Sequence, residues 1–280
     1  TSVAAGVYAP EIKLPRKLKK TLDPQRILKR QRTLSPANQD LLVKIKELKD
    51  EHPSWGYRRV WAHLKFRQNI NVNKKRIHRI MKLENLLVPP NLKLKSKRTP
   101  TRSKPRTLEP NTIWGTDMTK ILIPNSGWVY LHIVIDWGSK KIVGHSLKTT
   151  SRTDDWLTAL HTGINNQFPN GIKEANPYLQ LVSDNGCQPT SKRFMSECKS
   201  LGVQQVFTSY NNPKGNADTE RVIRTIKEDL IWPREWDNIY ELKEKLLEWI
   251  QNYNEDFPHS SLGYMTPYDY EAWFNASQAT

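Results

Sequence analysis

Hydrophobic positions recur at helical spacing through residues 35–88. A first helix is predicted to begin at Ser35, where a serine N-cap precedes a proline in the first turn, and to end before Pro53. Two shorter helices follow, and their apolar faces are formed by Tyr57, Val60, Trp61 and Leu64 and by Ile77, Ile80 and Met81. Because a brief polar turn joins these two helices, we predict a small all-α helix-turn-helix domain over residues 35–88.

The other face of the third helix is strongly basic. It carries Lys74, Lys75, Arg76, Arg79 and Lys82. The second helix of a helix-turn-helix lies in the major groove of DNA, where cations of this kind contact phosphates. We therefore predict that these five residues bind DNA. The alternative is a surface helix that is basic without having a partner.

The pattern changes to strand-like segments at residue 111. Apolar and alternating runs predict three antiparallel strands at residues 112–123, 128–137 and 140–149. Helices and strands then alternate, with helices at 154–166, 191–201, 216–230 and 239–253 and strands at 179–183 and 203–208. This order predicts an α/β fold in which helices flank a mixed five-stranded sheet.

Charge divides the chain into a basic part and a slightly acidic part. The net charge of +16 is the sum of +20 over residues 1–110, with 28 Lys/Arg and 8 Asp/Glu, and −4 over residues 111–280, with 16 and 20. A long basic stretch favours a polyanionic partner such as DNA, because binding releases counterions from the phosphates.

Composition and pattern together predict five regions. Residues 1–34 form a basic arm and residues 89–110 a basic linker, since both contain few apolar residues with which to build a core. Between them lies the helical domain of residues 35–88. The sheet domain occupies residues 111–235, and residues 236–280 form a C-terminal helix and tail packed on it.

The location of the protein is expected to be cytoplasmic. No apolar run approaches the roughly 20 residues that a membrane-spanning helix needs, so we expect no membrane partner. Residues 1–10 lack an initiator methionine, a basic first segment and a long apolar core. We interpret this start as a fragment end, because a signal peptide has those features.

Three carboxylates stand at positions suited to metal binding. Asp117 lies within a predicted core strand, Asp184 ends the fourth strand, and Glu220 lies early in a helix. A carboxylate on a core strand is costly to bury unless it is paired or binds a cation. Three such groups can hold two Mg²⁺ ions and support an in-line phosphoryl displacement. We predict that all three are catalytic metal ligands, although an aspartate at a strand end is commonly a turn cap.

Two cations follow Glu220 on the same predicted helix face. Arg224 and Lys227 are four and seven residues further on, so we predict that they contact the DNA phosphate backbone. The structural alternative is a simple ion pair between Glu220 and Arg224. We interpret Asp136, at the end of the second strand, as a turn or scaffold residue.

The motifs around these residues resemble those of a known family. Asp184 and Glu220 have 35 residues between them, as in the DD(35)E signature of retroviral integrases and insertion-sequence transposases. Residues 52–60, His-Pro-Ser-Trp-Gly-Tyr-Arg-Arg-Val, resemble the element that opens the family's helix-turn-helix segment. Over residues 35–272 the chain is similar to the second-frame (OrfB) catalytic subunit of the two-frame insertion-sequence family. It departs from the family pattern at Phe257, where an arginine is usual.

The resemblance implies an RNase H-like DDE catalytic domain over residues 111–235. It implies binding of the terminal inverted repeats and of target DNA, and Mg²⁺-dependent cleavage and strand transfer. The two Mg²⁺ ions would be replaceable by Mn²⁺, with Asp117 bound to both and Asp184 and Glu220 to one each. A homo-oligomer on DNA, a first-frame (OrfA) partner or fusion, and a nucleoid-associated location in a bacterium are also implied.

Two other functions remain as alternatives at this point. One is a non-catalytic DNA-binding regulator, which would not need the three carboxylates. The other is a hydrolytic RNase H-like nuclease, for which a basic helix-turn-helix would have no evident use.

Overall fold

The computed structural model of the chain describes residues 34–89, 107–172, 178–208 and 215–278. It divides into two compact units, residues 1–47 and 48–280. The predicted basic arm, apart from Leu34, and residues 90–106 of the predicted linker lie outside the described residues. Within the described ranges, no helix combines the length and the apolar character needed to cross a membrane.

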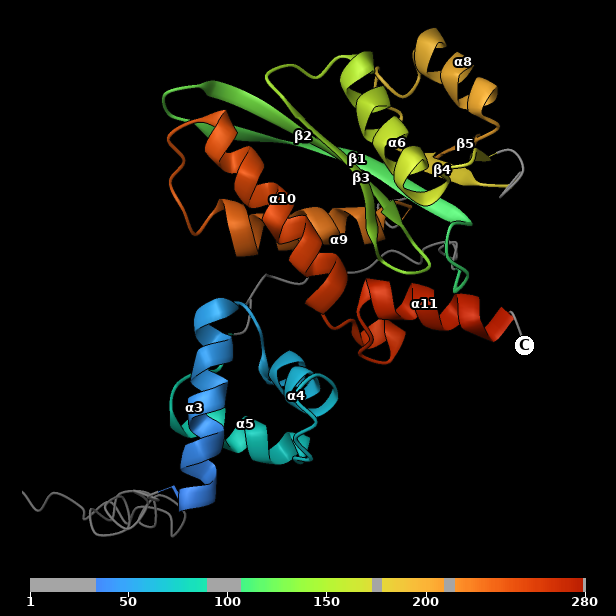
Figure 1. The fold of residues 1–280 in the computed structure, drawn as a ribbon. Coiled ribbons are helices and arrows are strands. Elements are labelled where there is room, and N and C mark those ends of the chain that lie inside the picture. The colour runs from blue at the N-terminus through green and yellow to red at the C-terminus, as the bar shows by residue number, and fades with distance from the viewer. Residues whose placement is uncertain (1–33, 90–106, 173–177, 209–214, 279–280) are drawn as a thin grey trace, which may run out of the picture. The chain divides into compact units, whose positions relative to one another are not determined.

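The helical region contains the three predicted helices (Figure 1). They are α3 (Pro36–Glu51), α4 (Tyr57–Phe66) and α5 (Lys74–Leu83). The Asn73 side chain caps α5 by accepting a hydrogen bond from the Lys75 amide at 2.8 Å. Ile77, Ile80 and Met81 are buried as predicted, so α4 and α5 pack through their apolar faces and form the helix-turn-helix pair.

The sheet has the predicted five strands. They are β1 (Ile113–Ile123), β2 (Gly127–Asp136), β3 (Ile142–Lys148), β4 (Gln180–Ser183) and β5 (Gln204–Phe207). Their order across the sheet is β3-β2-β1-β4-β5. The first three strands are antiparallel, whereas β4 runs parallel to both β1 and β5. The mixed sheet is therefore confirmed, and every strand begins and ends within two residues of its predicted bounds.

Helices α6 (Thr153–Gln167) and α8 (Lys192–Leu201) cover one face of the sheet (Figure 1). Their side chains form the main buried core together with Trp114, Val134 and Leu181 from the strands. α6 lies very close to β3, because Gly144 and Gly163 meet where the two elements cross. This tight packing fixes the sheet edge that β3 forms.

The other face of the sheet is covered by α9 (Ala217–Ile226) and α10 (Ile239–Asp256) (Figure 1). Between them, η1 (Lys227–Ile231) is a π-helical turn in which the Trp232 amide donates to the Lys227 carbonyl, five residues back. The single α-helix predicted for residues 216–230 is therefore wrong in its last turn. α10 is held on β3 by Asn254, whose side chain pairs with the amide and the carbonyl of Ile142.

The C-terminal segment contains η2 (Ser260–Leu262) and a further helix, α11 (Pro267–Gln278), which the sequence analysis did not predict. Thr266 caps α11 by accepting a hydrogen bond from the Asp269 amide, and Pro267 occupies the first turn. The Tyr270 hydroxyl donates to the Leu108 carbonyl at 2.8 Å, which ties α11 to the residues just before the sheet.

Candidate active site

Strand register places Asp117 beside Asp184. β1 and β4 are parallel, and Gly115 pairs with Val182, 67 residues later in the chain. Asp117 and Asp184 are separated by the same 67 residues, so continuing this register by two residues places them opposite each other. Side chains two residues apart on a strand point to the same face. A Cβ on Gly115 would meet Thr219 of α9 at 2.1 Å, so this is the face that α9 covers. Both aspartates therefore point to the α9 side of the sheet.

Two polar contacts fix α9 on the sheet. The Asn216 side chain, just before the helix, donates to the Thr116 carbonyl of β1 at 3.1 Å. The buried Trp137 indole donates to the Thr219 hydroxyl at 3.1 Å. Glu220 follows Thr219 directly, so these contacts hold its backbone over the strands that carry the two aspartates. Sequence reasoning did not single out Asn216 or Thr219.

The environment of Asp117 differs from that of its two partners. Burial, together with the negative charges of Asp184 and Glu220, raises the pKa of Asp117 to about 6, while the Met118 amide and Lys227 act in the opposite direction. Asp184 and Glu220 are exposed. The Asp184 carboxylate accepts a hydrogen bond from the Gly186 amide at 3.0 Å, which is the turn cap considered as an alternative.

The three carboxylates share one face without forming a closed set of ligands. Across the described ranges, no cluster of three or more His, Cys, Asp and Glu side chains is close enough to hold a metal ion. Like charges repel one another, and the negative charges of the other two carboxylates raise the pKa of Asp117. Among the described residues, the metal-ligand role of these three carboxylates therefore stays a prediction.

Arg224 and Lys227 extend this face along the helix. Arg224 is exposed and lines a shallow groove together with Glu220, while Lys227 is half-buried and acts on the pKa of Asp117. No ion pair joins Glu220 to Arg224 in the described part of the chain, so the simple structural pairing is not formed. The predicted contacts of Arg224 and Lys227 with the DNA phosphate backbone stay a prediction.

Asp136 supports the turn after β2, as the sequence interpretation proposed. Its fully buried carboxylate accepts hydrogen bonds from the amides of Asn111, Gly138 and Ser139 and from the Ser139 hydroxyl. Burial raises the pKa of Asp136 to about 6 in spite of these donors. This network holds the turn that begins with Trp137, and Trp137 in turn contacts α9.

The predicted DNA-binding residues of α5 differ in exposure. Lys75, Arg79 and Lys82 are exposed, whereas Arg76 and Lys74 are half-buried. The Lys74 ammonium lies 4.1 Å from the centre of the Trp61 ring and 5.1 Å from that of Tyr264. These cation–π contacts already hold Lys74 against the protein. The exposed basic surface of α5 is thus carried mainly by three of the five predicted residues.

Comparisons with known families identify the two regions. The model of an integrase core domain matches residues 107–213, a second integrase core model matches residues 201–267, and the model of an HTH-like domain matches residues 36–93. Together with the strand order, these matches confirm the predicted fold, an RNase H-like core preceded by HTH-like helices.

Individual proteins are similar over most of the chain. The transposase InsD for insertion element IS2A/D/F/H/I/K of Escherichia coli is 26% identical over 242 residues, which cover 82% of this chain and 78% of InsD. Among solved structures, the simian T-cell lymphotropic virus intasome in complex with PP2A regulatory subunit B56 gamma is 16% identical with a TM-score of 0.47 and covers 81% of this chain and 74% of that chain. The HTLV-2 integrase catalytic core domain in complex with magnesium is 20% identical with a TM-score of 0.45, over 59% of this chain and 99% of that chain.

Proposed function

Because the chain belongs to the DDE family of bacterial insertion-sequence transposases, and is thus a polynucleotidyl transferase, we propose that it cuts and joins the ends of an insertion sequence. In this proposal it binds the terminal inverted repeats and performs Mg²⁺-dependent cleavage and strand transfer to target DNA. The observation that carries the proposal is the β1–β4 register, which, continued two residues beyond its last pair, brings Asp117 opposite Asp184 under the helix that bears Glu220.

The chemistry of the donor set fits a hard divalent cation. Asp117, Asp184 and Glu220 offer carboxylate oxygens, which Mg²⁺ and Mn²⁺ both accept as ligands. The pKa of Asp117 is raised by burial and by the two other carboxylates, so a bound cation would relieve the cost of ionising it. Two Mg²⁺ ions held there would activate the attacking oxygen and stabilise the leaving oxygen of an in-line displacement.

Each of these residues would contribute to the reaction according to its position in the site. Asp117, the more buried of the two strand carboxylates, would contribute to both ions, and Asp184 and Glu220 would each complete one. Arg224 and Lys227 would hold the phosphate backbone beside the reacting bond, since both lie on the Glu220 side of the helix. The rigid sheet would keep the aspartates in place while DNA enters.

The DNA partners follow from the same proposal. The exposed face of α5 would contact the terminal repeats, and the chain would act as a homo-oligomer that brings two element ends together. A first-frame (OrfA) segment, as partner or fusion, would add further contacts to the repeats. Cleavage and joining would then occur only after the homo-oligomer has brought two element ends together.

A joining assay tests the proposal directly. Labelled duplexes that carry the terminal repeats of the host element are incubated with the full chain and Mg²⁺, and products are separated on a denaturing gel. We expect joined products with Mg²⁺ and none after its removal with EDTA, because ionised carboxylates cannot position the phosphate without the cation. Cut but unjoined DNA would instead indicate a hydrolytic nuclease, and binding without any product would indicate a regulator.

Replacing Arg79 by alanine should weaken binding to element ends. Arg79 is an exposed cation on α5, so its loss should lower affinity and reduce the dependence of log affinity on log salt by about one unit if it contacts a phosphate. Affinity is measured by fluorescence anisotropy at several salt concentrations. Arg193→Ala on α8 is the matched control, since Arg193 is exposed and paired with Asp154 at 2.7 Å. Equal affinities of the two variants would reject the groove-binding role of α5.

A further inference from the structure

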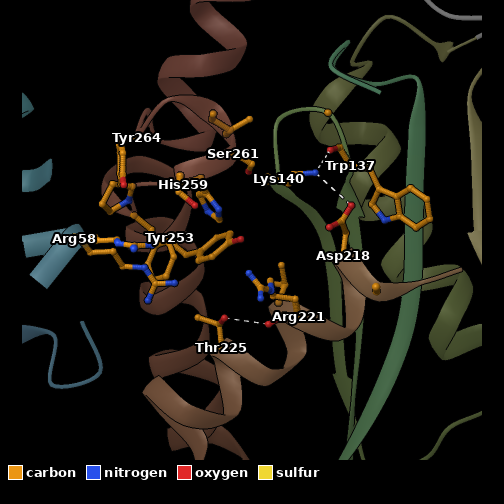
Figure 2. Close-up of a pocket in the computed structure, with 18 of the residues that line it drawn as sticks. Arg58, Trp137, Lys140, Asp218, Arg221, Thr225, Tyr253, His259, Ser261 and Tyr264 are labelled. Carbon is orange, nitrogen blue, oxygen red and sulfur yellow. Dashed lines mark hydrogen bonds and ion pairs between the residues drawn. The ribbon is translucent and has the colours of Figure 1, made fainter. Parts of the chain in front are cut away.

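A second and larger cavity lies against a different face of α9. Its volume is about 810 Å³, and α9 contributes Ala217, Asp218, Arg221, Val222 and Thr225 to its wall. The start of α4, the turn after β2 and the segment from Tyr253 to Tyr264 complete the lining (Figure 2). The three proposed metal ligands are not among the lining residues, so the cavity does not include the proposed metal site.

The lining is strongly cationic. It contains Arg58, Arg59, Lys140 and Arg221, against one acid, Asp218. Asp218 is engaged with Lys140 at 3.4 Å. The exposed Arg221 side chain has no hydrogen bond or ion pair with another described residue, and the Arg59 guanidinium lies over the Phe257 ring at 4.2 Å. The lining therefore carries an excess of positive charge, even though Asp229 and Glu228 outside it act on Arg59.

Two buried polar atoms in the wall also lack partners. The Tyr253 hydroxyl and His259 Nε2 make no hydrogen bond within the described residues, although both atoms are shielded from solvent. In Figure 2 the Tyr253 hydroxyl points toward the side where Lys140 and Asp218 lie. Burial raises the pKa of Tyr253 and lowers the pKa of His259 to about 3, so Tyr253 stays a hydroxyl donor and the His259 ring stays neutral. Unpartnered donors beside an excess of positive charge are the features of a site for an anion.

The cavity is continuous with the groove beside Glu220. Arg59, Arg221 and Thr225 line both the cavity and the shallow groove that contains Glu220 and Arg224. A DNA strand that passes Glu220 can therefore reach the cavity along a path of arginine side chains. Two of the aromatic residues in the lining, Tyr57 and Tyr264, offer ring surfaces to a base.

We propose that this cavity binds an unpaired nucleotide of the DNA, with its phosphate held by Arg221 and the Tyr253 hydroxyl. The volume lies within the range of about 300–1,000 Å³ that is usual for small-ligand sites, so it suits one or two nucleotides of a single strand and not a duplex. The inference rests on the proposed function, because it takes DNA as the partner. In this proposal, a single DNA strand that passes the carboxylate face continues into the cavity.

Binding of DNA with and without an overhang tests this site. Affinities of the full chain for a blunt repeat duplex and for the same duplex with a short single-stranded overhang are measured by anisotropy without divalent cations. The ratio of the two affinities removes the contribution of α5, which is common to both duplexes. We expect the wild type to prefer the overhang by about tenfold and Arg221→Gln to lose that preference, since a charge-assisted hydrogen bond is removed. Lys199→Gln, an equal charge change at an exposed site on α8, should keep it.

No outcome of this assay depends on cleavage. If joining fails but the overhang preference depends on Arg221, the nucleotide site is supported and the proposed reaction is contradicted. If joining succeeds while the wild type shows no preference, or Arg221→Gln retains it, the nucleotide site is overturned and the proposed reaction stands.

Tyr253→Phe separates a ligand contact from a packing role. The hydroxyl has no hydrogen-bond partner among the described residues, so its removal should leave thermal stability unchanged or higher. We expect the overhang preference to fall several-fold in this folded variant, because the proposed donor to the phosphate is gone. An unchanged preference would remove Tyr253 from the site.

Discussion

Replacing Glu220 by glutamine should reduce DNA joining by about a thousandfold or more. The loss of one anionic oxygen ligand weakens the hold on a catalytic cation, and an effect of about 4 kcal/mol on the barrier corresponds to that factor. Glu220 is exposed at the surface of α9, so the substitution should leave the fold intact. Single-turnover joining rates with Mg²⁺ measure the effect, and anisotropy should show a DNA affinity close to that of the wild type.

Matched variants complete this experiment. Asp117→Asn and Asp184→Asn should behave as Glu220→Gln does, and retained joining in any one of them would remove that residue from the site. Glu244→Gln on the exposed face of α10 makes the same chemical change away from the sheet and should join DNA at the wild-type rate. A parallel loss of DNA affinity and joining in the carboxylate variants would indicate a structural role instead.

The strands and most helices could be predicted because the hydrophobic pattern of each one reflects the packing of that element alone. β2 reads as a continuous apolar run since its residues from 131 to 136 are buried on both faces, and α5 carries its apolar residues at helical spacing because one face packs on α4. α11 escaped notice because its pattern is weak: only Pro267 and Tyr270 are buried along it. The sequence does contain one signal for the start of this helix, the capping residue Thr266 followed by Pro267.

The residues of the candidate site could be proposed from the sequence, but the contacts that support them could not. The spacing of Asp184 and Glu220 and the strand position of Asp117 are visible in the sequence. The contact of Trp137 with Thr219, 82 positions apart, depends on tertiary packing that no local pattern records. The same limit applies to Lys74, whose cation–π contact with Trp61 was not visible in the helix pattern that assigned it to DNA.

The departure from the family pattern at Phe257 also has a tertiary reason. The Phe257 ring receives the Arg59 guanidinium at 4.2 Å and lies 5.0 Å from the Tyr253 ring. Arg59 belongs to the motif of residues 52–60. An aromatic ring at position 257 thus joins that motif to the segment after α10 through a cation–π contact that a second arginine could not make with Arg59.

Replacing Gly144 by alanine should destabilise the catalytic core by about 3 kcal/mol or more. A Cβ on Gly144 would lie 2.1 Å from the Ala159 carbonyl oxygen and 2.7 Å from the Gly163 amide nitrogen. Both obstacles are backbone atoms of α6, so the strand and the helix must separate, and overpacking of this kind costs more than a side-chain adjustment. Urea denaturation at neutral pH measures the free energy of unfolding, and the variant should lose joining activity in proportion to its unfolded fraction.

Two further glycine substitutions give this prediction a graded control. A Cβ on Gly163 would meet the Trp114 and Val143 side chains at 3.3 Å, which small shifts can accommodate, so Gly163→Ala should cost clearly less than Gly144→Ala. A Cβ on Gly56, the N-cap of α4, meets nothing within 4 Å, and Gly56→Ala should change stability by no more than about 1 kcal/mol. If Gly144→Ala proved as stable as Gly56→Ala, the close approach of β3 to α6 would be wrong. The catalytic strands would then lack the rigid edge that the backbone contact gives them.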